Sequence, residues 1–193
     1  MVTKMTEKYI QIAAAWYPVT VFGVGKKLGI WFQGCSKSCK DCISPEYREY
    51  GAGVRTTVEQ LLSLDKEINP EGLVISGGEP FDQPEALYQL VTAFVKNYND
   101  NILVYTGYTL DELIRKNNTA ISNTLKEIAV LIDGTYIPEL NKGKGLAGSD
   151  NQVIHVMKHQ DQYLDAEKWD RKLMCILKED NTLWMIGVPP LEV

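Results

Sequence analysis

Residues 29–42 read GIWFQGCSKSCKDC, an apolar strand-like run that leads into three cysteines within eight positions. Iron–sulfur clusters are usually held by four thiolates, and a structural zinc site is closed by four cysteine or histidine ligands. Cys35, Cys39 and Cys42 supply only three ligands, and no fourth cysteine lies nearby in the sequence. The spacing therefore predicts a cubane iron–sulfur cluster in which one iron stays open to bind another molecule.

The composition indicates one domain. The chain has 193 residues, of which 45% are apolar, with 15 Gly and 8 Pro spread along it. This length suits one compact domain with a sizeable core and is short for two, so residues 1–193 are interpreted as a single domain. The formal net charge is −5, from 20 basic and 25 acidic residues, and no basic stripe emerges. We therefore expect no nucleic-acid partner.

The N-terminal residues carry no signal for export or membrane insertion. Residues 1–10 lack a long apolar run and a cleavage site, and the apolar residues 12–16 are too few to span a bilayer. We expect a cytoplasmic protein with no membrane partner, in which thiols stay reduced and clustered cysteines favour metal binding over disulfides. Cys175 lies in the apolar run 173–177, where a buried free cysteine is expected and a fourth cluster ligand is the alternative.

Short apolar runs alternate with amphipathic stretches. Strands are expected to begin near residues 30, 73, 102, 129 and 153, with helices between them. Thr56 with Glu59, and Thr109 with Glu112, have capping-box spacing, and Pro84 suits a first helical turn. Strands that alternate with helices form parallel βα units. Since a full eight-fold barrel takes about 250 residues, the chain is expected to form an α/β fold with a partial, open parallel βα barrel.

The C-terminal residues are expected to extend this barrel. Residues 160–172 are polar and predict a helix, whereas residues 173–188 predict a terminal β-hairpin that turns at residues 179–181. The single domain would thus consist of a core over residues 10–158 and a C-terminal extension over residues 159–193.

Polar or glycine-rich segments follow the first four expected strands. The cysteine loop follows the first strand, residues 77–80 (Gly-Gly-Glu-Pro) the second, Thr106 and Gly107 the third, and Asp133 the fourth. Functional sites of parallel βα folds gather at the carboxyl ends of strands, so these segments are expected to form one site. Adjacent glycines admit a ligand whose carboxylate their amides can bond, and Glu79 could accept hydrogen bonds from an ammonium group. This combination suits a bound amino acid, although the segment alone is also typical of a turn.

Cys35-x3-Cys39-x2-Cys42 followed by Gly77-Gly78-Glu79-Pro80 resembles the radical S-adenosylmethionine (SAM) superfamily. In that family three cysteines hold a 4Fe–4S cluster, and the amine and carboxylate of SAM bind the fourth iron. The resemblance covers about residues 10–158. Three later runs resemble one branch of the glycyl radical enzyme activases, the activating enzyme of anaerobic ribonucleotide reductase: VYTGYTLDEL (104–113), VLIDGTY (130–136) and GSDNQVIHV (148–156).

The resemblance implies roles for individual residues. Cys35, Cys39 and Cys42 would be the cluster ligands, and no catalytic acid or base is expected because the cofactor carries the chemistry. Gly77, Gly78 and Glu79 would bind the methionyl end of SAM, and the backbone at Asp41 and Ile43 would lie near the adenine. Thr106 would contact the ribose or the carboxylate of SAM. Two weaker candidate contacts are Asp133 and Asn151. A structural strand-end threonine, an Asp-Gly turn and a loop cap are the alternative explanations for the last three residues.

The reaction that the resemblance implies starts with one electron passing from the reduced cluster to SAM. The C5′–S bond breaks to give methionine and a 5′-deoxyadenosyl radical, which removes a hydrogen atom from the substrate. In an activase this hydrogen comes from the α-carbon of a glycine in a glycyl radical enzyme, such as anaerobic ribonucleoside-triphosphate reductase. A flavodoxin- or ferredoxin-type protein would donate the electron, and the wide lateral opening of a short barrel would admit a peptide loop.

Two other functions stay open at this point. A stand-alone radical SAM enzyme that modifies a peptide or a small molecule fits the motif, although the chain has no cysteines for a second cluster. A non-catalytic iron–sulfur carrier or zinc module would need four ligands. Asp41 and Ile43 depart from residues often found beside the third cysteine, and the tail 159–193 is longer than in compact activases. These departures leave the partner open.

Overall fold

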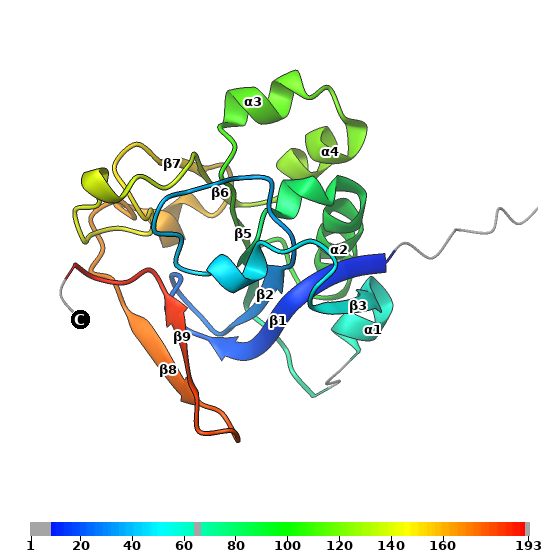
Figure 1. Cartoon of the computed structure of the whole chain (residues 1–193). Coiled ribbons are helices and arrows are strands. Elements are labelled where there is room, and N and C mark those ends of the chain that lie inside the picture. Colours follow the sequence, from blue (N-terminus) through cyan, green and yellow to red (C-terminus); the bar gives the residue numbers. More distant parts are fainter. Residues whose placement is uncertain (1–8, 64–66, 192–193) are drawn as a thin grey trace, which may run out of the picture.

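The computed structural model describes residues 9–63 and 67–191, so the expectations for residues 1–8 lie outside the described part. Within these ranges the chain forms a seven-stranded sheet, a separate two-stranded hairpin and four α-helices (Figure 1). The strands are β1 (Tyr9–Val19), β2 (Lys27–Phe32), β3 (Val54–Thr57), β4 (Gly72–Gly77), β5 (Ile102–Tyr105), β6 (Val130–Asp133), β7 (Val153–Val156), β8 (Leu173–Leu177) and β9 (Leu183–Gly187). The helices are α1 (Val58–Leu62), α2 (Pro84–Asn97), α3 (Leu110–Arg115) and α4 (Thr119–Glu127).

The sheet is open and rich in parallel strands. Its strand order is β3-β1-β2-β4-β5-β6-β7, and β2, β4, β5 and β6 pair in parallel. The connections from β4 to β5 and from β5 to β6 contain helices, the usual form of the long crossover that parallel pairing requires. The prediction of an α/β fold with a partial, open parallel barrel is confirmed. Antiparallel strands β1 and β3, which the sequence analysis did not identify, extend the sheet on the side of β2.

Strand β7 differs from the expectation because it runs antiparallel to β6. The sequence indicated a fifth strand near residue 153 and implied that it would continue the parallel series. In the described structure the connection between β6 and β7 contains one short 3-10 turn, η3 (Pro138–Leu140), and no α-helix. Without a helical crossover the chain returns along the edge of β6, and an antiparallel strand results.

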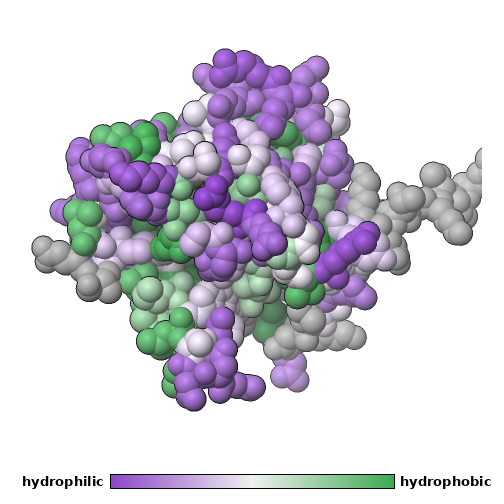
Figure 2. All heavy atoms as spheres, in the orientation of Figure 1, coloured by the Kyte–Doolittle hydropathy of each residue, from purple (hydrophilic) through white to green (hydrophobic). Residues whose placement is uncertain are grey.

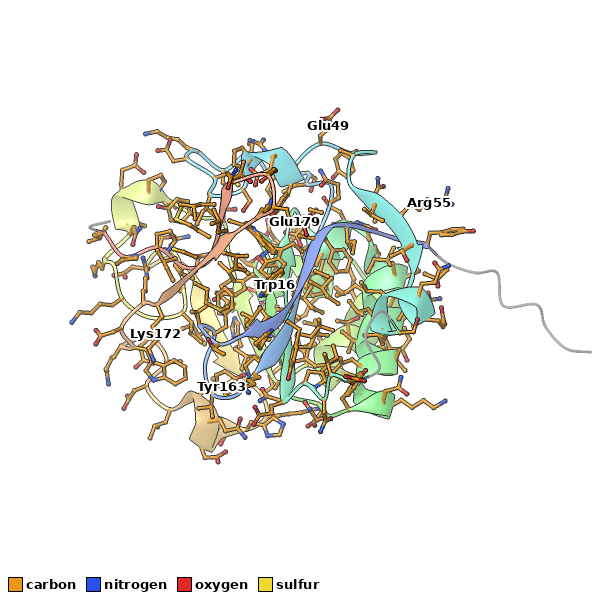
Figure 3. The ribbon with its side chains drawn as sticks, turned by 90° about the horizontal axis from the view of Figure 1, so that it is seen from below. Trp16, Glu49, Arg55, Tyr163, Lys172 and Glu179 are labelled. Carbon is orange, nitrogen blue, oxygen red and sulfur yellow. The ribbon has the colours of Figure 1, made fainter. Side chains whose placement is uncertain are left out.

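The two faces of the sheet pack against different parts of the chain. Along β4, Leu73 and Ile75 contribute to the core beneath the helices, whereas Val74 contributes to the core on the other face, as strand alternation requires. C-terminal residues such as Leu146 and Ile186 cover this second face. Helix α2 and the β8–β9 hairpin therefore lie on opposite sides of the sheet (Figures 1 and 3). Burial on both faces explains why every residue of β2 is buried.

Most helix boundaries agree with the sequence signals. The capping box at Thr109 and Glu112 and the Pro84 start of α2 are confirmed. Helix α1 is capped by Thr57 and Gln60 rather than by Thr56 and Glu59 as expected, because the sequence offers two such boxes one residue apart. No helix in the described ranges has the length and hydropathy needed to cross a bilayer.

The C-terminal extension contains the expected hairpin but not the expected helix. Strands β8 and β9 pair from Leu173↔Gly187 to Leu177↔Leu183, whereas residues 160–172 form a short 3-10 turn, η4 (Gln160–Tyr163), and irregular chain. Cys175 is exposed rather than buried. The outer side chains of the hairpin are also exposed, and Figure 2 shows apolar surface over it with a hydrophilic tip.

The hairpin is attached to the sheet by aromatic contacts. The Trp184 ring lies edge-to-face with Trp31, at 5.0 Å between ring centroids, and with Trp16, at 5.9 Å. Arg171, which precedes β8, donates hydrogen bonds to the carbonyl oxygens of Gly145, Ala147, Gly148 and Pro189. These contacts hold the extension against the face of the sheet opposite the helices.

Removing a buried side chain of α2 tests the packing of the helical layer. Leu90 is fully buried beneath the sheet, so Leu90→Ala should lower the free energy of unfolding by about 2–5 kcal/mol. Ile114→Ala on α3 removes a similar apolar group from a side chain that is 59% exposed, and a change within about 0.5 kcal/mol is expected. Urea unfolding of equally reduced and equally iron-loaded samples measures both values. Equal losses in the two variants would contradict this assignment of the core.

Candidate functional site

The segments that follow the parallel strands meet at one edge of the sheet. The Gly78 amide donates to Phe32 O at 2.7 Å, and the Glu79 amide donates to Gly34 O at 2.8 Å, which joins residues 77–79 to the start of the cysteine loop. The Gly107 amide then donates to Glu79 Oε2 at 2.8 Å. Further along the edge, the Gly134 amide donates to Tyr108 O at 2.8 Å. The structure thus brings four segments that are distant in sequence into one connected cluster of loops.

The cysteine loop carries three thiols that form no disulfide. Cys35, Cys39 and Cys42 are each partly buried, and burial raises the pKa of the Cys35 thiol to about 11. A metal ion that binds the thiolate would overcome this effect. Among the described residues no three Cys, His, Asp or Glu side chains lie close enough to hold one metal ion. By number and type, Cys35, Cys39 and Cys42 are the donors that three corners of a 4Fe–4S cluster need.

Gly78 is required by the close approach of two backbones. A Cβ atom at this position would overlap the carbonyl oxygen of Gly34 and would lie 2.7 Å from the carbonyl oxygen of Tyr47. The preceding Gly77 has a φ of +106°, a conformation that other residues rarely adopt. From the sequence, the glycine pair is expected to admit a ligand. In the structure the pair first allows the cysteine loop to lie directly on the end of β4.

Glu79 is buried and its carboxylate is held by three donors. Oε1 accepts hydrogen bonds from the Phe81 amide at 3.0 Å and from Thr106 Oγ1 at 2.8 Å, and Oε2 accepts the bond from Gly107. Burial raises the pKa of Glu79 to about 7, although these hydrogen bonds oppose the shift. The Thr106 hydroxyl also accepts a bond from the Tyr108 amide at 3.1 Å. Thr106 therefore orients Glu79 in this structure.

Asp133 and Asn151 make contacts that account for both residues without a ligand. The buried Asp133 carboxylate accepts hydrogen bonds from the amides of Leu110 and Val153 and pairs with His155 Nε2 at 3.0 Å, which joins β6, β7 and the start of α3. Asn151 is exposed and donates to Thr135 O at 2.8 Å. Their proposed contacts with SAM stay predictions.

Asp41 and Ile43 lie on the outer part of the cysteine loop. Both residues are exposed, Ile43 by 61%, and Asp41 has a φ of +54°. Aspartate tolerates this left-handed conformation better than most residues do. Asp41 and Ile43 therefore lie on a part of the loop that is open to solvent, where a planar ligand group could reach them.

Several residues of the site were missed by the sequence analysis. Asp82 accepts hydrogen bonds from Ser36, Tyr50 and Tyr108. The Gln83 side chain donates to the carbonyl oxygens of Gln11 and Gln33. Asp82 and Gln83 lie two and three residues beyond Pro80, the end of the 77–80 segment, and this position in the sequence was the available signal. Nothing in the sequence identified their distant partners.

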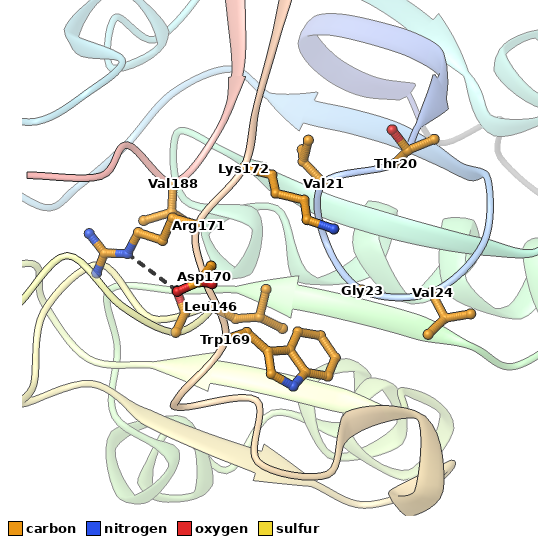
Figure 4. Close-up of a pocket in the computed structure, with 11 residues that line it drawn as sticks. Thr20, Val21, Gly23, Val24, Leu146, Trp169, Asp170, Arg171, Lys172 and Val188 are labelled. Atoms are coloured by element: carbon orange, nitrogen blue, oxygen red, sulfur yellow. Dashed lines mark hydrogen bonds between the residues drawn. The ribbon is translucent and has the colours of Figure 1, made fainter. Parts of the chain in front are cut away.

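The cavity shown in Figure 4 lies away from this site. It has a volume of about 450 Å³ and lies between residues 20–24, which precede β2, and residues 169–172. The cysteine loop leaves the opposite end of β2. The chemistry-bearing residues are therefore at the carboxyl edge of the sheet and not in this cavity.

The pH dependence of stability tests the burial of Glu79. Because its pKa of about 7 in the folded protein exceeds the ordinary 4.5, the folded protein keeps a proton that the unfolded chain loses as the pH rises. The contribution of Glu79 to the free energy of unfolding should therefore fall between pH 4.5 and 7, by up to about 3 kcal/mol. Urea unfolding at several pH values should show this fall in the wild type and not in Glu79→Gln.

Glu85→Gln serves as the matched control because Glu85 is an exposed carboxyl in the first turn of α2. This variant should keep the pH profile of the wild type. Identical profiles for the wild type and Glu79→Gln would contradict a raised pKa at Glu79.

Known proteins resemble this chain over most of its length. Residues 21–155, which include the three loop cysteines and Glu79, match the family model described as a 4Fe-4S single cluster domain. The anaerobic ribonucleoside-triphosphate reductase-activating protein of Enterobacteria phage T4 is 28% identical over 140 residues, which cover 69% of this chain and 86% of that protein. The pyruvate formate-lyase-activating enzyme of Clostridium pasteurianum is 29% identical over 140 residues, which cover 68% of this chain and 56% of that enzyme.

Among solved structures, the crystal structure of QueE from Escherichia coli aligns with a TM-score of 0.44 and 19% identity, over 52% of this chain and 54% of that one. The family match contains both the cysteine loop and the segment that carries Glu79, whereas the β8–β9 hairpin lies beyond it. The chain therefore belongs to the 4Fe-4S single cluster domain family, among the activase-like proteins of the radical SAM superfamily.

Proposed function

We propose that this protein is an activating enzyme that cleaves SAM at a 4Fe–4S cluster and thereby installs a glycyl radical on a large partner enzyme. The observation that carries this proposal is the three-thiol loop joined to a buried, oriented Glu79 at the carboxyl edge of a parallel sheet. When bound, the cluster supplies the electron that breaks the C5′–S bond of SAM. The chain itself holds the cofactors and orients them for the partner.

In this proposal Cys35, Cys39 and Cys42 hold three irons, and Glu79 binds the methionyl ammonium group. A carboxylate has about four acceptor positions, and three of those on Glu79 are occupied by Phe81, Thr106 and Gly107. The remaining position lies on Oε2, where an ammonium group can donate. Because three protein donors already hold the carboxylate, little further ordering is needed when the ligand binds.

The other residues predicted to lie near SAM take different roles in this proposal. Gly77 and Gly78 keep the methionyl-binding segment close to the cysteine loop, and the adenine lies against the backbone of the exposed residues Asp41 and Ile43. Thr106 acts by orienting Glu79. Asp133 and Asn151 act mainly by holding the β6–β7 connection, through the contacts described above.

A protein substrate is favoured by the open edge of the sheet and by the relatives. The three thiols stay partly exposed, and the C-terminal hairpin packs on the face of the sheet through Trp16 and Trp31. The phage relative, whose name is that of an activating protein for anaerobic ribonucleoside-triphosphate reductase, is covered over 86% of its length. We therefore infer a reductase of that kind as the partner, with a flavodoxin- or ferredoxin-type electron donor in the cytoplasm.

Radical formation on the partner tests this proposal. The reconstituted, reduced protein is mixed without oxygen with SAM and the large subunit of the anaerobic reductase from the same source. Electron paramagnetic resonance should detect an organic radical on the reductase whose splitting by the α-hydrogen disappears when its glycines carry α-deuterium. Deuterium should also appear in the 5′-deoxyadenosine. Formation of this nucleoside with no radical on the reductase would contradict the proposal and favour a stand-alone modifying enzyme.

A further inference from the structure

Asp82 is the point at which three segments of the site meet. It ends the short turn η2 (Pro80–Asp82) just beyond Glu79. Its Oδ2 accepts hydrogen bonds from the Ser36 amide at 2.7 Å and from the Tyr50 hydroxyl at 2.6 Å. Its Oδ1 accepts from Ser36 Oγ at 3.0 Å and from the Tyr108 hydroxyl at 2.9 Å. One carboxylate therefore receives four hydrogen bonds from three different segments.

These donors close the cysteine loop on itself. Ser36 directly follows Cys35, whereas Tyr50 lies beyond the last cysteine, and its ring covers Gly34 closely enough that a Cβ there would be 2.6 Å from it. Burial acts to raise the pKa of Asp82, but the hydrogen bonds from Tyr50, Ser36 and Tyr108 outweigh this effect and lower it. Asp82 is therefore a charged acceptor, and hydrogen bonds to charged groups are among the stronger ones in proteins.

The start of the cysteine loop, at residues 34–36, makes more hydrogen bonds to other segments than residues 38–43 do. Besides the bonds to Asp82, the Cys35 amide donates to Arg48 O at 3.1 Å, and the Gly34 amide donates to Tyr47 O at 2.8 Å. Within the part of the chain that the structure describes, residues 38–43 make no backbone hydrogen bond to another segment. Their contact with the rest of the protein includes the exposed ion pair of Lys40 with Glu139, and such pairs contribute little.

We propose that Asp82 is a positioning residue that holds Cys35 in place before the cluster arrives, so that the cluster assembles on Cys35 and the loop then closes through Cys39 and Cys42. This inference rests on the proposed use of the three cysteines as cluster ligands and not on the identity of the partner. Residues that orient metal ligands also tune the metal, and their loss typically reduces metal affinity about 10- to 100-fold. Loss of Asp82 should therefore change the bound cluster as well as the loop.

The first measurement is amide hydrogen exchange in the cluster-free protein. Asp82→Ala should speed exchange at Ser36 by about 10- to 100-fold, because the amide loses a charged acceptor. Asp82→Asn keeps the shape and one acceptor oxygen, and an intermediate rate is expected. The matched control is Asp111→Ala, which removes an exposed carboxylate in the first turn of α3 and should leave the rate unchanged.

The second measurement follows the cluster. After anaerobic reconstitution, Asp82→Ala should lose iron to a chelator about 10- to 100-fold faster than the wild type. The reduced cluster should also give a shifted electron paramagnetic resonance spectrum and a shifted midpoint potential. Tyr50→Phe and Tyr108→Phe each remove one donor and should give smaller changes in the same direction. These two variants keep the test valid if Asp82→Ala does not fold.

Two results would overturn the inference. Ser36 exchange that is unchanged in Asp82→Ala would mean that Asp82 does not hold the loop. Faster exchange with unchanged iron retention, spectrum and potential would mean that Asp82 only stabilises the surrounding structure. By contrast, a wild-type protein that takes up no cluster would overturn the proposed function, and the exchange rates would still report whether Asp82 holds the loop.

Discussion

The contact of the Gly78 backbone with the carbonyl oxygen of Gly34 is the constraint on which the rest of the site depends. Only a residue without a Cβ fits there, and the approach lets the amides of Gly78 and Glu79 donate to Phe32 and Gly34. This requires β2 and β4 to be parallel neighbours that end together. Cys35 and Glu79 lie just beyond the ends of the two strands, so the sheet itself brings the first loop cysteine and this buried carboxylate close together.

Side chains from outside the two strands then stiffen this arrangement. Asp82 joins the two ends of the cysteine loop to the β5–α3 connection, and Gln83 joins the loop to β1 through the carbonyl oxygens of Gln11 and Gln33. The C-terminal extension packs on the face of the sheet that the helices leave uncovered. The three thiols at the carboxyl edge of the sheet stay partly exposed.

The sequence predicted what depends on local spacing and missed what depends on distant contacts. Cysteine spacing, capping boxes and apolar runs gave the loop, the helices and most strands. The direction of β7 could not be predicted, because strand alternation looks the same in both directions. Residues 160–172 are polar enough for an exposed helix, yet tertiary bonds such as that of Tyr163 to Asn101 hold them in irregular chain. The four hydrogen bonds of Asp82 likewise join residues that are 26–46 positions apart.

Formation of 5′-deoxyadenosine from SAM tests the central claim most directly. The protein is reconstituted with iron and sulfide without oxygen and reduced, and the four cysteines are replaced one at a time. The account predicts that the wild type and Cys175→Ala form the nucleoside, because Cys175 lies on the hairpin outside the cysteine loop. Cys35→Ala, Cys39→Ala and Cys42→Ala should fall to background. Activity that survives loss of a loop cysteine, or tight zinc binding with no cluster in the wild type, would contradict the account.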